Sequence, residues 1–130
     1  MLKLNDKVIM SDSWIIILDE IAIKLIDKSF LKYNESGIPK DIRGYFEIKD
    51  LKKRDSIDIK LKFNNIEYKA LLNMAVDSRS KIRWSKELGE VLRYKFQIKD
   101  DELDNWINKN NYKIIFRKIG TDIYDISMDR

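Results

Sequence analysis

The stretch "SIDIKLKFNNIEYKALLN", residues 56–73, carries the clearest structural pattern in the chain. Apolar and polar residues alternate over 57–63, and the alternation resumes over 66–72. A period of two predicts two half-buried strands with one apolar face. Asn64 and Asn65 lie between them, and asparagine tolerates the positive φ of a two-residue turn. The stretch therefore predicts an antiparallel hairpin.

The register of this hairpin sets the charges on its outer face. A two-residue turn at 64–65 places Lys62 opposite Glu67 and Lys60 opposite Lys69. Like charges directly opposite each other destabilise a strand pair unless an anionic group lies nearby. The Lys60–Lys69 pair is therefore the first indication of an anionic partner.

A second basic stretch follows, "SRSKIRWSK", residues 78–86. In a strand, Arg79, Lys81 and Arg83 project to one face, with an apolar row behind them and no acid in the stretch. Such a row can bind phosphates, and an arginine can also fork onto a guanine edge. The alternative is a solvated face whose cations pair with carboxylates elsewhere. The candidate nucleic-acid-binding residues are Arg79, Lys81, Arg83, Lys86, Lys60, Lys62 and Lys69.

Composition limits the classes of function. The chain has 130 residues and a net charge of +4, which permits a nucleic-acid partner without requiring one. It contains no cysteine and no histidine, which excludes disulfides, histidine-based catalysis and the usual zinc sites. No apolar run reaches the roughly 18 residues of a membrane span. We expect a single cytoplasmic domain, 1–130, with no membrane partner and no cofactor.

The N-terminal third predicts a long helix over residues 13–33. Its polar residues recur at helical spacing and form a narrow stripe, and Ser11 or Ser13 can cap its start. Such a helix would be a central core element or half of a dimer contact. The polar stripe consists of Asp19, Glu20, Lys24, Asp27 and Lys28.

The remaining elements complete the expected fold. "IPKDIRGYF" (38–46) predicts a short helix, Ser85 caps a helix reaching Phe96, and a further helix begins at Asp100 or Asp101. The C-terminal residues 112–128 predict a second hairpin. The predicted class is α+β: a mainly antiparallel sheet of two hairpins plus a short strand, packed on the long N-terminal helix and two or three shorter helices.

One constellation raises a catalytic alternative. Asp58, followed on the return strand by Glu67 and Lys69, has the outline of a magnesium-dependent nuclease site, with two carboxylates for the metal and a lysine near the attacking water. The pattern is loose, and it also occurs by chance in hairpins rich in lysine and glutamate. A surface charge pair is the preferred explanation, because both carboxylates would lie on the outer face of the hairpin without an evident cleft.

Three pieces of the chain together resemble a known group of domains: "IPKDIRGYF" (38–46), "IEYKALL" (66–72) and "RSKIRW" (79–84) followed by a helix. They are similar to the accessory DNA-recognition domains of restriction-type endonuclease systems. The resemblance implies a compact pseudobarrel or sheet that presents basic residues to duplex DNA, with Arg79, Lys81 and Arg83 as contacts. The chain departs from a full restriction enzyme because no convincing nuclease core accompanies these pieces, so we expect a stand-alone or excised module, or a small phage-type regulator.

Three hypotheses follow. The leading one is a non-enzymatic module that binds double-stranded DNA with its basic strand and hairpin, as the target-recognition part of a restriction or phage-defence system. The second is a small protein–protein interaction or inhibitor module that uses the apolar first helix, with a protein partner or a second copy. The third is the magnesium-dependent nuclease.

Overall fold

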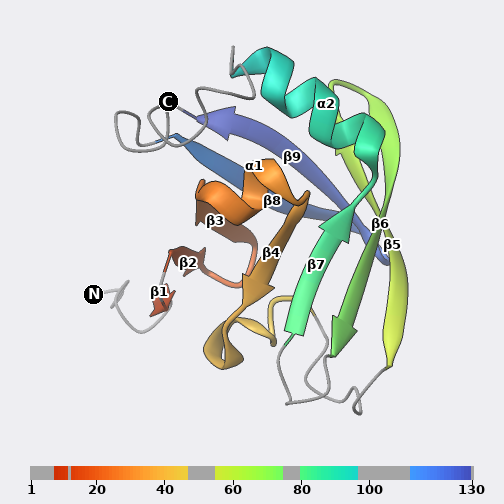
Figure 1. The fold of residues 1–130 in the computed structure, drawn as a ribbon. Coiled ribbons are helices and arrows are strands. Elements are labelled where there is room, and N and C mark those ends of the chain that lie inside the picture. Colours follow the sequence, from red (N-terminus) through yellow and green to blue (C-terminus); the bar gives the residue numbers. More distant parts are fainter. Residues whose placement is uncertain (1–7, 12, 47–54, 75–79, 97–111, 130) are drawn as a thin grey trace.

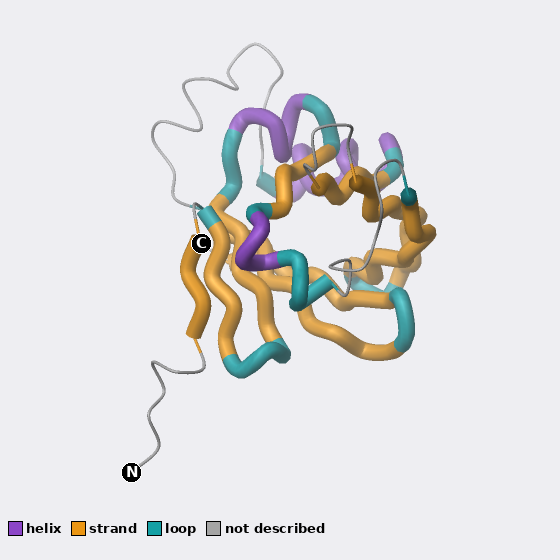
Figure 2. The backbone as a smooth tube through the Cα atoms, turned by 90° about the horizontal axis from the view of Figure 1, so that it is seen from below, coloured by secondary structure: helices purple, strands orange, loops and turns teal. Residues whose placement is uncertain are grey.

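The fold is one nine-stranded sheet that curls on itself (Figures 1 and 2). The computed structural model describes residues 8–11, 13–46, 55–74, 80–96 and 112–129. The strand order is β1-β2-β3-β8-β9-β5-β6-β7-β4, and every neighbouring pair is antiparallel except β5 and β9. The strands are β1 (Val8–Ser11), β2 (Trp14–Ile17), β3 (Ile21–Leu25), β4 (Glu35–Ile38), β5 (Ser56–Phe63), β6 (Ile66–Met74), β7 (Ser80–Trp84), β8 (Lys113–Gly120) and β9 (Ile123–Asp129).

Helices occupy the openings of this sheet. α2 (Lys86–Lys95) lies across one end of it, begins at the N-cap Ser85 and buries Leu88 and Leu92 (Figure 1). α1 (Lys28–Lys32) joins β3 to β4, and the 3-10 turn η2 (Lys40–Ile42) follows β4. These helices do not form a separate layer, so the sheet buries its apolar face mainly against itself.

An aromatic cluster fills the interior where the sheet closes. Phe46, just after η2, packs edge-on against Trp14 at a centroid distance of 5.5 Å and against Phe116 at 5.8 Å. Trp14 of β2 and Phe116 of β8 are each 1% exposed. The cluster therefore joins the N-terminal strands to the C-terminal hairpin.

One hydrogen bond links the two sides of the curled sheet. The indole Nε1 of Trp14 donates to the carbonyl oxygen of Gly37 at 3.0 Å. Gly37 belongs to β4, one edge of the sheet, and Trp14 lies in β2, beside the other edge strand β1. We call the junction of β2 and β4 the seam.

Several predictions from the sequence are confirmed. β5 and β6 form the predicted hairpin, with Asn64 and Asn65 at φ values of 50° and 67° and with Lys60 opposite Lys69. β7 covers the predicted short strand, Ser85 caps α2 through the Leu88 amide, and β8 and β9 form the C-terminal hairpin. Strong local patterns placed each of these elements correctly.

The predicted fold class is wrong, because the long N-terminal helix does not exist. Residues 14–25 form the strands β2 and β3, and the described part of the chain is mostly strand with two short α-helices. The polar residues taken for a helical stripe have other roles. Leu18 and Asp19 are the turn, with φ values of 52° and 58°, and Glu20 closes it by donating its amide to the Ile17 carbonyl.

The error has a physical cause. The segment is rich in isoleucine, whose branched Cβ favours strands, and burial in β2 alternates with a period of two. Lys24 interrupts the alternation of apolar and polar residues, because this charged residue occupies an inward-facing position and is 2% exposed. The ammonium of Lys24 is accommodated there by Ser13 and Asp27, a partnership that the sequence does not reveal.

Some predictions fall outside the described residues, namely the helix expected from Asp100 or Asp101 and the position of Arg79. Within the described ranges, no helix has the length and apolar character needed to cross a membrane.

The seam makes a prediction about stability. Trp14→Phe removes the hydrogen bond to Gly37, whereas Trp84→Phe removes an indole whose buried Nε1 has no hydrogen-bond partner among the described residues. We expect Trp14→Phe to lower the free energy of unfolding by about 1 kcal/mol more than Trp84→Phe does. Urea denaturation of both variants measures the difference, and equal losses would contradict a stabilising seam.

The interior also predicts a response to alkaline pH. Burial, with a smaller contribution from Tyr124, raises the pKa of Tyr45, whose hydroxyl lies 3.1 Å from the carbonyl oxygens of Glu20 and Phe116. The unfolded chain loses this proton near pH 10 and the folded chain does not, so stability falls above pH 10 by up to about 1.4 kcal/mol per pH unit.

Tyr45→Phe should therefore flatten the decline in unfolding free energy between pH 10 and pH 11.5. Tyr94→Phe is the matched control because Tyr94 is 79% exposed. Identical pH profiles for the two variants would refute the assignment.

Candidate nucleic-acid interface

The predicted cations gather on the outer face of the sheet, over β5, β6 and β7. Lys60 and Lys62 project from β5, Lys69 from β6, and Lys81 and Arg83 from β7, because residues of the opposite parity are buried inside. Lys86, the first residue of α2, is exposed. The structure thus brings five predicted residues onto one face, which we call the basic face.

The register defines the most continuous part of this face. Lys60 lies directly opposite Lys69, and Arg83 lies opposite Leu71, two residues along β6 from Lys69. Diagonal neighbours of this kind are about 7–8 Å apart, within reach of long side chains. Lys60, Lys69 and Arg83 therefore form a row across three strands.

Carboxylates interrupt the basic face, which the acid-free stretch 78–86 did not predict. Glu35 of β4 lies opposite Arg83, with its carboxylate oxygens 3.1 Å from Lys81 Nζ and 3.7 Å from Arg83 Nε. Glu67 lies 3.8 Å from Lys60. Lys69 forms no ion pair with any described residue, so its charge is the least compensated in the row.

Glu35 is the residue that sequence reasoning missed. It lies 48 residues before Arg83, at the point where the predicted long helix was expected to end. The pairing of β4 with β7 brings Glu35 beside Lys81 and Arg83. No local pattern in the sequence predicts that pairing.

The nuclease constellation does not assemble into a metal site. Asp58 lies opposite Leu71 and Glu67 lies opposite Lys62, so the two carboxylates are four residues apart along the hairpin, about 13 Å at the rise of a strand. Metal–oxygen distances of about 2.0–2.6 Å require much closer convergence. No group of three or more acidic side chains that could hold a metal occurs in the described part of the chain.

A hollow nevertheless borders the hairpin at this place. A cavity of about 640 Å³ is lined on the hairpin side by two lysines and two carboxylates and on the other side by the β8–β9 turn. The charged lining residues are Lys60, Lys69, Asp58 and Glu67 of the hairpin and Asp122 of the turn. The backbone amide of Lys60 donates to the carbonyl of Asp122 at 2.9 Å, which fixes the turn beside the hairpin. Two members of the row, Lys60 and Lys69, therefore border a concave surface that also carries carboxylates.

The opposite half of the outer face is apolar. Ile15 of β2 lies between Met10 of β1 and Ile23 of β3, and Met10 is 71% exposed. Leu25, at the end of β3, is 38% exposed. The outer surface thus changes from apolar over β1–β3 to charged over β5–β7.

The uncompensated Lys69 leads to a prediction. Lys69→Glu replaces a like-charge pair with an opposite-charge pair facing Lys60, so the free energy of unfolding should rise by about 0.5 kcal/mol. Chemical denaturation of the single and double variants in a cycle with Lys60→Gln measures this coupling. The gain should be smaller in the Lys60→Gln background, where only Arg83 still attracts the new carboxylate. A gain of undiminished size there would show that the pair with Lys60 is not its source.

Comparison with known proteins identifies the fold. No model of a protein family matches the chain, and no curated protein matches it. Among solved structures, the chain is similar to the N-terminal domain of Helicobacter pylori LlaJI.R1, with a TM-score of 0.56 and 16% sequence identity over 85% of this chain and 81% of that one. At this identity the likeness is one of fold.

Proposed function

We propose that this chain is a non-enzymatic DNA-recognition module of a restriction-type or phage-defence system. The observation that carries the proposal is the row Lys60–Lys69–Arg83, in which two lysines face each other and Lys69 has no acidic partner among the described residues. The resemblance of residues 38–46, 66–72 and 79–84 to DNA-recognition domains of restriction-type systems supports it. So does the fold shared with the N-terminal domain of LlaJI.R1.

In this proposal the lysines contact phosphates, which position the protein on the duplex, and the arginines contact phosphates or base edges. Arg79 is assigned to the interface from the sequence alone, because it lies outside the described residues. The phosphate contacts are assigned to Lys60, Lys62, Lys69, Lys81 and Lys86.

Glu35 has a specific role in this scheme. To bind, the duplex must separate Lys81 and Arg83 from Glu35. Ion pairs at the surface contribute less than about 1 kcal/mol, so breaking them costs little free energy. The Glu35 carboxylate also repels any phosphate that approaches. It therefore lowers the affinity of the basic face for DNA in general.

A salt series with a fluorescent duplex tests the proposal. The logarithm of the binding constant should fall linearly with the logarithm of the salt concentration, with a slope near −0.9 per neutralised phosphate. Arg83→Glu and Lys69→Glu should each weaken binding at least roughly tenfold and make the slope shallower by about one. Glu35→Gln should strengthen binding.

Two variants on α2 provide matched controls. Lys95→Glu and Glu90→Gln make the same charge changes at exposed positions away from the basic face, and both should bind nearly as the wild type does. If Arg83→Glu and Lys69→Glu bind no more weakly than Lys95→Glu, the basic face is not the interface.

The apolar outer face of β1–β3 favours a second candidate, a protein-interaction module. The helix first expected to provide that contact does not exist, but exposed Met10 and Leu25 lie on the strands formed in its place and beside it. Absence of duplex binding even at low salt, together with concentration-dependent self-association in sedimentation experiments, would favour this candidate over the first.

A further inference from the structure

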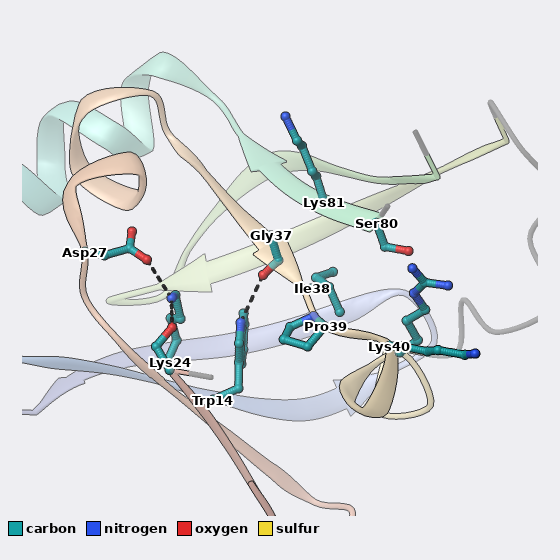
Figure 3. Close-up of a pocket in the computed structure, with 11 residues that line it drawn as sticks. Trp14, Lys24, Asp27, Gly37, Ile38, Pro39, Lys40, Ser80 and Lys81 are labelled. Carbon is teal, nitrogen blue, oxygen red and sulfur yellow. Dashed lines mark hydrogen bonds and ion pairs between the residues drawn. The ribbon is translucent and has the colours of Figure 1, made fainter. Parts of the chain in front are cut away.

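A second cationic site lies at the seam, separate from most of the basic face. A cavity of about 550 Å³ opens beside the Trp14–Gly37 hydrogen bond and is lined by residues of β2, β3, β4, η2 and the start of β7 (Figure 3). Its volume is within the usual range for small-molecule sites, about 300–1,000 Å³. The curl of the sheet creates this cavity, because it lies where β2 meets β4.

The lining carries more cations than carboxylates, although Lys81 also pairs with Glu35 outside it. Four cations line the cavity, Lys24, Lys40, Arg43 and Lys81, against one carboxylate, Asp27. Both oxygens of Asp27 are already engaged, since Oδ1 accepts the Phe30 amide at 3.0 Å and Oδ2 accepts from Lys24 at 2.8 Å. Concave surfaces lined by charges of one sign focus the field and concentrate counter-ions.

Lys24 is the most unusual of these cations because its ammonium is almost wholly buried. Two of its three donors bond to Ser13 Oγ and Asp27 Oδ2, and the ammonium also lies over the Trp14 ring, 5.8 Å from its centroid. The described residues supply no third oxygen acceptor. A buried ammonium is costly unless its donors are matched. An acceptor supplied by a ligand in the cavity would complete its coordination.

Lys40 and Arg43 line the part of the cavity away from Lys24, and both belong to the turn around η2. Pro39, with φ at −59°, leads into η2, and residues three apart in a 3-10 turn are aligned on one side. Lys40 and Arg43 have this spacing, and both line the cavity. Lys40 forms no ion pair with any described residue. Figure 3 shows Lys24 and Lys40 at opposite ends, with Trp14 and Pro39 between them.

We propose that the seam cavity binds a phosphorylated ligand, with the phosphate held by Lys40 and Arg43 and a polar group of the ligand directed toward Lys24. A phosphate has more acceptor oxygens than a carboxylate, so it can accept from the planar fork of Arg43 and from Lys40 at once. The phosphate comes either from a free small molecule or from the backbone of bound DNA. Binding of a free phosphorylated small molecule does not depend on the function proposed for the basic face.

Gly37 provides an isosteric test. A Cβ added at Gly37 has no heavy atom within 4 Å, and its φ is not positive, so side chains are tolerated there. Gly37 lines the cavity and lies on the exposed side of β4 opposite Lys81, so Gly37→Asp adds a carboxylate at the cavity edge and Gly37→Asn adds a neutral group of the same shape. A difference in affinity between Gly37→Asp and Gly37→Asn therefore reports the effect of the added charge.

The first arm uses inorganic phosphate, titrated against chloride at constant ionic strength. The Trp14 indole N–H, which bonds to Gly37 at the cavity wall, is the NMR reporter. We expect a saturable shift in the wild type and in Gly37→Asn, and an affinity weakened roughly tenfold in Gly37→Asp. Lys40→Gln should weaken it similarly, whereas Lys95→Gln, on exposed α2, should not.

The second arm uses the fluorescent duplex with the same variants, and it separates the two sources. A response to inorganic phosphate without a difference between Gly37→Asp and Gly37→Asn on the duplex assigns the site to a free phosphorylated molecule. A difference on the duplex assigns it to a backbone phosphate where Lys40→Gln also weakens duplex binding, because Gly37→Asp lies beside Lys81 of the basic face as well. A difference on the duplex without a loss in Lys40→Gln, and without a response to inorganic phosphate, reports the basic face and overturns the proposal. If Gly37→Asp and Gly37→Asn behave alike in both arms, the proposal is overturned, whatever Arg83→Glu does at the basic face.

Discussion

The hydrogen bond from the Trp14 indole to the Gly37 carbonyl joins the two sides of a sheet for which the described residues form no second layer. A sheet with one apolar face must bury that face, usually against helices or another sheet. In the described part of the chain, two short α-helices and one 3-10 turn cover the openings, so most of the burial comes from curling. The seam holds the curl closed, and the contact of Phe46 with Trp14 and Phe116 fills the interior that the curl encloses.

The edge strand β4 connects the two candidate sites. Through Glu35 it faces the cations of β7, and through Gly37 it borders the seam cavity. Lys81 takes part in both, since it pairs with Glu35 and also lines the cavity. The two candidate sites therefore share one cation, whose ion pair with Glu35 lies between them.

The sequence-based predictions were correct for elements that depend on residues close together in the chain, and wrong for those that depend on distant residues. The hairpin of β5 and β6 was predictable with its register because alternation and an Asn-Asn turn act within 18 residues, and α2 was predictable from its Ser85 cap and its apolar side. The helix over 13–33 was mispredicted because Lys24 broke the alternation. Its burial depends on Ser13, eleven residues away, and on Asp27.

The sequence by itself determined the strand pairs that are close along the chain, the cap of α2 and the set of cations that point outward from β5–β7. The tertiary structure decided which charges meet. Pairing of β4 with β7 places Glu35 between Lys81 and Arg83, and the curl of the sheet brings Lys24 and Lys40 to one cavity. These pairings connect residues far apart in sequence, and they arise from burial of the whole apolar face, which no short segment encodes.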